Sequence, residues 1–301
     1  MVEAVRALLH GVVDYAGMFP PAKLELAEAL ATYARARTGK HAWMLGRSVI
    51  PASLLGDFVR IALNGGSQDP PLQKGNGSPW PLSLIANGDA GEREMVQRFN
   101  MEKRGRAVIA ALEFPPLSNA EIDQIARQTP DGVEMFFEVP LGEDFAGRVA
   151  TVAWHGARVK IRTGGVVANA FPDASELVRC MRVCANSRVA FKASAGLHHA
   201  VCGRYALTYE ADSALASMYG FLNICVAATL VHMGAPDTTA VDALREGSAK
   251  AFAFTPGGLV WRDRTLPTTD LADARRSFFR SFGSCAFSEP VEDLERLGLM
   301  E

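Results

Sequence analysis

Two lysines lie in short apolar runs of the sequence, where a charged side chain is costly to bury. Lys160 belongs to the run RVKIRT and Lys192 to the run VAFKAS. A lysine amine attacks a carbonyl only when it is unprotonated, and burial or a neighbouring ammonium group favours the neutral form. Adjacent parallel strands lie about 4.8 Å apart, so lysines at the same level would interact. The pattern predicts that one of the two lysines forms a Schiff base and that the other lowers its pKa.

Other polar side chains follow the ends of apolar runs and complete the predicted site. Glu113 and Glu138 end two earlier runs, and we expect either one to move protons during the reaction. An arginine or histidine is expected to bind an anionic or hydroxylated end of the substrate. The predicted catalytic residues are Lys160, Lys192, Glu138 and Glu113, and the predicted substrate-binding residues are Arg162, Thr163, Ser194, His198, His199 and Asp14.

Two other interpretations of these residues stay open. The lysines could form internal ion pairs, Lys160 with Glu138 for example, in a barrel with a binding role and no catalysis. Alternatively, oxygen and nitrogen donors from Glu113, Glu138, His198 and His199 could hold a divalent metal ion in a lyase or isomerase. Loss of activity with a chelator would distinguish the metal enzyme.

Apolar runs alternate with helix-like segments along most of the chain. We predict strands at 11–18, 43–50, 81–88, 106–114, 132–139, 158–164 and 189–196, and helices at 23–37, 52–64, 90–103, 118–128, 142–153 and 174–185. Strands that are apolar on both faces and separated by helices are typical of a parallel sheet covered by helices. The repeat length fits a (β/α)8 TIM-type barrel, in which loops after the strands form the active-site face.

The eighth strand is ambiguous in the sequence. Residues 250–255 are one candidate, although 252–261 could instead form a hairpin around Pro256-Gly257-Gly258. A doubly wound open sheet is the competing architecture. The prediction is a single barrel domain over residues 1–301, with a Pro/Gly-rich loop at 65–79 and a helical C-terminal tail in which Cys285 is packed.

A longer stretch around the lysines resembles a known enzyme family. KIRTGGVVANAFPDASELVRCMRV and VAFKASAGL share a Lys-x-x-Thr-Gly run, an Asn-Ala-x-Pro-acidic turn and a Phe-Lys-x-x-x-Gly run with deoxyribose-phosphate aldolase. The resemblance covers residues 159–199 and implies a class I aldolase barrel with Lys160 as the Schiff-base lysine and Lys192 as the residue that lowers its pKa. That family binds the substrate phosphate with a glycine-rich, basic turn, whereas this chain has AGLHH there. We therefore expect a small carbonyl or sugar-like substrate without a required phosphate. Outside this stretch the chain resembles an uncharacterised bacterial protein family.

Composition narrows the classes of partner. The 301 residues are 49% hydrophobic and carry a net charge of −2, which does not favour nucleic acid or anionic membranes. Five widely spaced cysteines argue against a disulfide framework and favour the reducing cytoplasm. No cofactor is expected for Schiff-base chemistry, and we expect a homo-oligomer because many barrels are oligomeric.

Overall fold

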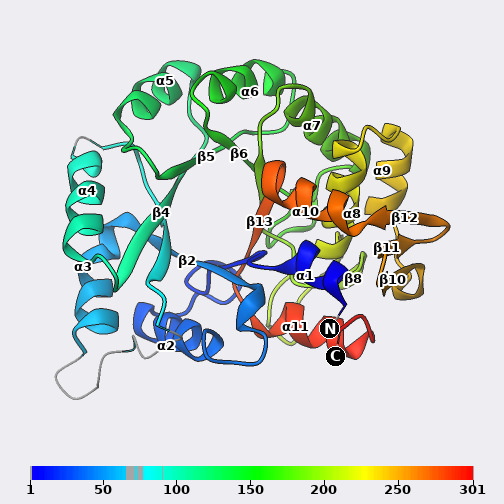
Figure 1. The fold of residues 1–301 in the computed structure, drawn as a ribbon, viewed down its shortest axis with the longest axis horizontal. Coiled ribbons are helices and arrows are strands. Elements are labelled where there is room, and N and C mark those ends of the chain that lie inside the picture. The colour runs from blue at the N-terminus through cyan, green and yellow to red at the C-terminus, as the bar shows by residue number, and fades with distance from the viewer. Residues whose placement is uncertain (1, 66–71, 73–76, 90, 301) are drawn as a thin grey trace.

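The chain forms a closed barrel of eight parallel strands. A computed structural model describes residues 2–65, 72, 77–89 and 91–300. The strand order around the barrel is β1-β13-β7-β6-β5-β4-β3-β2, and each neighbouring pair is parallel. Figure 1 shows the strands around the centre with helices outside them. This arrangement confirms the predicted (β/α)8 barrel.

The barrel strands coincide with the apolar runs of the sequence. Seven of them fall within or beside the predicted ranges, because side chains on both faces of a barrel strand are covered. The strands are β1 (Val13–Tyr15), β2 (Leu45–Pro51), β3 (Trp80–Ile85), β4 (Ala107–Phe114), β5 (Glu134–Glu138), β6 (Arg158–Arg162), β7 (Phe191–Ser194) and β13 (Phe279–Ser284).

Helices cover the outer face of the barrel between successive strands. They are α2 (Leu26–Ala36), α3 (Leu55–Phe58), which continues into a π-helical turn at Val59–Leu63, α4 (Glu92–Glu102), α5 (Asn119–Gln128), α6 (Phe145–Trp154) and α7 (Ala174–Asn186). Side chains cap two of these helices: Ser118 and Glu121 form a capping box at α5, and the Asp173 side chain accepts the Ser175 N–H at α7.

The eighth barrel strand, β13, lies far beyond the segment expected from the sequence. The chain between β7 and β13 forms the hairpin β8 (Gly203–Ala206) and β9 (Leu215–Met218), helices α8 (Phe221–His232) and α9 (Asp237–Leu244), the antiparallel sheet β10 (Phe252–Thr255), β11 (Gly258–Trp261) and β12 (Arg264–Pro267), and helix α10 (Thr268–Ser277). Residues 250–255 are therefore not a barrel strand, and the hairpin interpretation is correct. The segment around Cys285, expected as a packed tail, instead closes the barrel.

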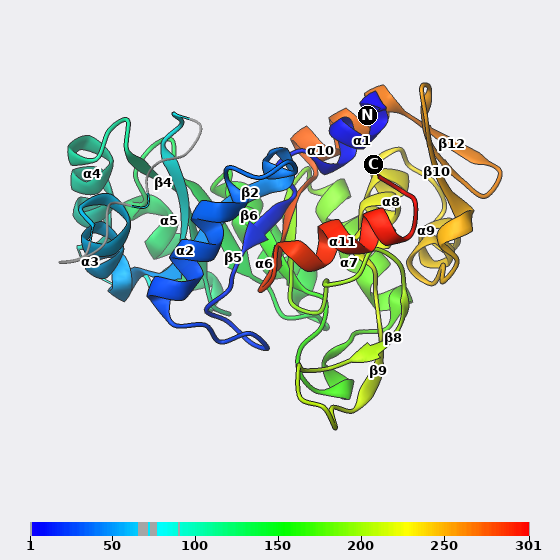
Figure 2. The ribbon, with the colours of Figure 1, turned by 90° about the horizontal axis from the view of Figure 1, so that it is seen from below.

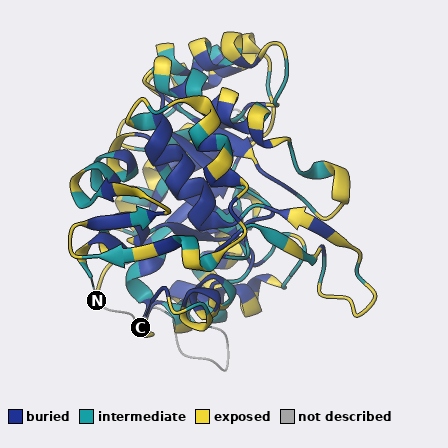
Figure 3. Ribbon diagram, turned by 90° about the vertical axis from the view of Figure 1, so that its right-hand side faces the viewer, coloured by how far each residue is buried: buried dark blue, intermediate teal, exposed yellow. Residues whose placement is uncertain are grey.

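Helix α8 is buried on nearly its whole circumference. Its residues from Phe221 to Val231 are all buried, since helices α7, α9 and α10 pack against it in addition to the barrel strand β13. Figure 3 shows the buried segments in dark blue gathered in the middle of the molecule. This double covering explains why the sequence of α8 is apolar all round. In the part of the chain that the structure describes, no helix has the length and apolarity to span a membrane.

The two ends of the chain lie near each other beside the barrel. Helix α1 (Glu3–Leu9), which the sequence analysis did not identify, packs against α10, and α11 (Ser288–Arg296) follows β13. Figure 2 shows α1, α10 and α11 on the same side of the molecule, with the β8–β9 hairpin projecting away from the barrel. Most of the predicted loop at 65–79 (66–71 and 73–76) falls outside the described residues.

Candidate active site

A cavity of about 410 Å³ opens at the carboxyl end of the barrel strands. Residues that follow or end the strands line it, as expected for the active-site face of this fold. The polar side chains in its wall are Glu113, Glu138, Lys160, Arg162, Lys192, Ser194, His198 and Cys285. Pro20 and Pro21, joined by a cis peptide bond, form part of its rim.

The two lysines lie at the same level of adjacent strands. Lys160 of β6 and Lys192 of β7 are register partners, and Glu138 of β5 is the register partner of Lys160 on the other side. Because neighbouring residues in register point the same way, all three side chains enter the barrel interior. The sequence-based expectation that the two lysine runs are adjacent strands is therefore met.

Lys192 is held between two carboxylates in the interior. Its Nζ donates to Asp14 Oδ2 and to Glu113 Oε1, both at 2.6 Å, and only 1% of its side chain is exposed. Burial alone would lower the pKa of Lys192, but the negative charges of Asp14 and Glu113 outweigh burial and raise it. Lys192 is thus an ammonium ion at neutral pH.

Lys160 has longer contacts with its carboxylates and borders the cavity. Its Nζ lies 3.2 Å from Glu138 Oε2 and 3.7 Å from Glu113 Oε2. Both acids have another cation as well: Glu113 binds Lys192 at 2.6 Å, and Glu138 accepts from Arg162 Nε at 3.2 Å. Lys160 therefore shares each of its partners.

Glu113 joins the two lysines. It contacts both amines and also accepts a hydrogen bond from the Ser83 hydroxyl at 2.7 Å. Burial would raise the pKa of Glu113, but the charges of Lys192 and Lys160 outweigh it and lower the pKa. Glu113 is consequently a carboxylate in the resting site. Ser83 was not identified from the sequence, because a serine within an apolar strand carries no motif.

Some predicted substrate-binding residues face the cavity and others do not. Arg162, Ser194 and His198 line it. The Thr163 hydroxyl donates to the carbonyls of Ser194 and Ala195, so it joins two loops of the barrel. His199 stacks on Tyr205, with 3.5 Å between ring centroids, and does not belong to the cavity wall.

Asp14 is an internal partner of Lys192 and lies outside the wall of this cavity. It also accepts from the Ser281 hydroxyl at 2.6 Å and from the Arg47 backbone N–H at 2.9 Å. Burial would raise the pKa of Asp14, but Lys192 and Arg47 outweigh burial and lower it. The sequence predicted Asp14 to bind substrate and gave no indication of the cation that it contacts.

Cys285, which was expected in a packed tail, belongs to the cavity wall. Its Sγ lies 3.9 Å from His198 Nδ1 and 3.4 Å from the Tyr209 hydroxyl. His198 Nδ1 also lies 3.0 Å from Glu289 Oε2. Burial would lower the pKa of His198, but its contacts with Cys285 and Glu289 raise it to about 9. Recognition of β13 as a barrel strand would have placed Cys285 at the active-site end.

The donors proposed for a metal ion are dispersed. His198 pairs with Glu289, His199 lies 4.0 Å from Asp293, and Glu113 and Glu138 bind the lysines. Within the described ranges, no group of three or more His, Cys, Asp or Glu side chains is arranged to hold a metal ion.

The fold and its cavity define the chain as a (β/α)8 barrel protein with a lysine- and carboxylate-lined site. Comparison of the chain with protein-family models, with curated proteins and with solved structures gave no match. Function is therefore argued from the site alone.

Proposed function

We propose that the protein is a Schiff-base, aldolase-like lyase that acts on a small carbonyl or sugar-like substrate. The observation that supports this most is the unequal environment of two adjacent amines. Lys192 is fixed as an ammonium ion by Asp14 and Glu113, whereas Lys160 shares its carboxylates and borders the cavity. A neighbouring ammonium favours the neutral form of a reacting amine.

The reaction begins at Lys160. Its neutral amine adds to the substrate carbonyl carbon, and the carbinolamine takes up a proton and loses water to leave an iminium ion that withdraws electrons from the bond between the α and β carbons. A carboxylate removes the proton of the hydroxyl group on the β carbon. The carbon–carbon bond then breaks, which releases an aldehyde and leaves an enamine on Lys160. Protonation of the enamine and addition of water release the second product and restore the amine.

Glu138 is the first candidate for the proton transfers. It lies 3.2 Å from Lys160 and lines the cavity, so it reaches both the amine and a bound substrate. Glu113 lies deeper and binds Lys192 more closely, which suits a positioning role. Arg162, with 56% of its side chain exposed at the cavity, and His198 are suited to bind an anionic or hydroxylated end of the substrate.

A barrel without catalytic activity is the alternative that one observation favours. Lys160 and Glu138 form the internal ion pair expected on that interpretation, at 3.2 Å. In a purely structural pair the amine would stay protonated and would not add to carbonyl compounds. A metal-dependent lyase or isomerase remains a proposal to be tested by activity before and after chelator treatment.

Borohydride trapping separates the enzyme from the structural pair. The protein is incubated with a panel of short aldehydes and ketones, reduced, and mapped by mass spectrometry. We expect a stable adduct at Lys160 with at least one compound, and no adduct at that site in Lys160→Met. Lys40, whose side chain is 69% exposed, reports the background of surface reaction in the same digest. Modification of Lys160 no greater than that of Lys40 across the panel would contradict the proposal.

A further inference from the structure

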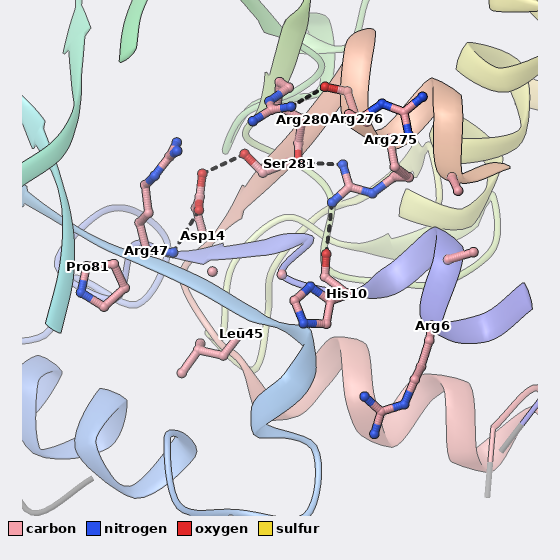
Figure 4. Close-up of a pocket in the computed structure, with 14 residues that line it drawn as sticks. Arg6, His10, Asp14, Leu45, Arg47, Pro81, Arg275, Arg276, Arg280 and Ser281 are labelled. Atoms are coloured by element: carbon pink, nitrogen blue, oxygen red, sulfur yellow. Dashed lines mark hydrogen bonds between the residues drawn. The ribbon is translucent and has the colours of Figure 1, made fainter. Parts of the chain in front are cut away.

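A second cavity lies at the opposite end of the barrel, beneath the strand starts. It measures about 540 Å³, and its wall comes from α1, the first residues of β2 and β3, α10 and the start of β13. Figure 4 shows its side chains. The charged residues in this wall are Arg6, Asp14, Arg47, Arg275, Arg276 and Arg280. We name this cavity the arginine pocket.

The arginines outnumber the carboxylates that could balance them. The single carboxylate of Glu134 pairs with three guanidinium groups, those of Arg47, of Arg158 at 2.8 Å and of Arg280 at 3.0 Å. Asp14, the only acid in the wall as described, is already bonded to Lys192, and Asp273, which pairs with Arg276, also pairs with His232. The pocket therefore has an excess of positive charge in a protein whose net charge is −2.

Two of the arginines have no carboxylate partner among the described residues. Arg6 lies over the Trp43 ring at 5.5 Å and is exposed. Arg275 uses its nitrogens on backbone carbonyls, including those of Leu8 at 2.8 Å and His10 at 3.1 Å. Arg275 therefore supplies mainly its positive charge, whereas the exposed guanidinium group of Arg6 is suited to bind an anion, because its planar N–H groups match phosphate and carboxylate oxygens.

A neighbouring hollow extends the same basic surface. It measures about 280 Å³, is lined by Arg158 and Arg188, and shares Arg276 and Arg280 with the arginine pocket. A ligand that carries two or more negative charges could therefore contact several guanidinium groups at once. A single monoanion would use only part of this surface.

We propose that the arginine pocket binds a small polyanion with phosphate or carboxylate groups, at a site separate from the carboxyl-end cavity. The proposal does not depend on Schiff-base chemistry. Inorganic pyrophosphate is the probe, and acetate is the monoanionic comparison. Titration calorimetry at constant ionic strength should show one saturable pyrophosphate site per chain with a Kd below about 1 mM, and acetate should bind at least about tenfold more weakly.

Paired variants test whether the arginine pocket holds the probe. Arg6 and Arg276 are exposed, so Arg6→Ala/Arg276→Ala should fold normally. We expect this variant to weaken pyrophosphate binding at least about tenfold. The control Arg98→Ala/Arg104→Ala removes two exposed arginines in and after α4 and should leave the Kd within about twofold. Lys160→Met at the other cavity should also leave it unchanged.

Three results would overturn the proposal. These are no saturable binding of pyrophosphate below about 1 mM, equal weakening in the two arginine double variants, or loss of binding in Lys160→Met. The last result would place the anion in the carboxyl-end cavity. Circular dichroism and the melting temperature of each variant show whether a loss of binding reflects a loss of fold.

Discussion

At the carboxyl end of the barrel each buried cation lies against a carboxylate, whereas at the amino end the guanidinium groups outnumber the acids beside them. The pKa shifts follow this difference. Asp14 and Glu113 raise the pKa of Lys192, and Cys285 and Glu289 raise the pKa of His198, while burial lowers the pKa of Arg275 to about 10. The cations at the carboxyl end are therefore paired with carboxylates of the chain itself, whereas the amino end is suited to bind an anionic ligand.

The two ends meet within the barrel interior at an aromatic ring. Phe136 is fully buried, with Lys192 Nζ 5.4 Å from its ring centroid and the guanidinium carbons of Arg47 and Arg158 at 5.9 Å. Cations of the lysine site and of the arginine group are thus attracted to the same ring. Phe136 therefore contacts both polar sites, which Asp14 also links through its bonds to Lys192 and to the Arg47 backbone.

Replacement of Lys192 should give the largest loss of stability, because it removes the cation that neutralises the buried carboxylates at the carboxyl end. Lys192→Met leaves Asp14 and Glu113 without their shared cation in a dry interior, and we expect unfolding to require about 3 to 5 kcal/mol less free energy. Lys160→Met should cost less, since Glu113 keeps Lys192 and Glu138 keeps Arg162. Urea unfolding measures both, and an equal or reversed order would contradict this account of the site.

The pH dependence of the free energy of unfolding should reveal the stabilising contribution of protonated His198. Its folded pKa of about 9 exceeds the ordinary value of 6.5, so its stabilising contribution is complete below pH 6.5 and is lost as the pH rises through 9. We expect the free energy of unfolding to fall by about 2 to 3 kcal/mol across this window. His198→Asn should lack this part of the decline. An identical decline in the variant would assign it to other groups.

Arg275 tests the opposite end, where backbone carbonyls, and no carboxylate of the described residues, accept the hydrogen bonds of a buried cation. Its hydrogen bonds join carbonyls near the end of α1 to those of Phe279 and Arg280 at the start of β13. Arg275→Ala leaves these carbonyls without a donor and should destabilise the protein by about 2 kcal/mol. The neighbouring Arg276→Ala should change stability by less than about 1 kcal/mol, because its ion pair with Asp273 is at the surface. Thermal unfolding compares the two variants. Similar losses of stability would show that the hydrogen bonds of Arg275 do not hold α1 and β13 together.

Asp14 faces the arginine pocket while it binds Lys192, so its charge should influence the amino end. Asp14→Asn removes the acid from the pocket wall, and we expect pyrophosphate to bind about fivefold more tightly, or about 1 kcal/mol. Glu113→Gln, which removes a negative charge outside that wall, is the matched control and should change binding less. Calorimetric titration of the folded variants measures this effect. Weaker binding in Asp14→Asn would contradict the electrostatic interpretation.

The sequence predicted the strands that form continuous apolar runs and the lysine pair that two of them carry. It did not predict β13, because FRSFGS contains polar residues and follows a long insertion with its own sheet. The contact of Asp14 with Lys192 joins residues 178 positions apart, and local patterns contain no information about such a pairing. The arginine pocket was missed for the same reason, since its walls come from both ends of the chain.

The late position of β13 has a consequence for how the protein is made. Strand β13 pairs with both β1 and β7, so a growing polypeptide cannot complete the sheet until residues 279–284 have been synthesised. Until then the edges of β1 and β7 stay unpaired, and exposed strand edges promote association between incomplete chains. A chain that terminates before residue 279 should therefore depend on chaperones or aggregate, even though it carries both lysines.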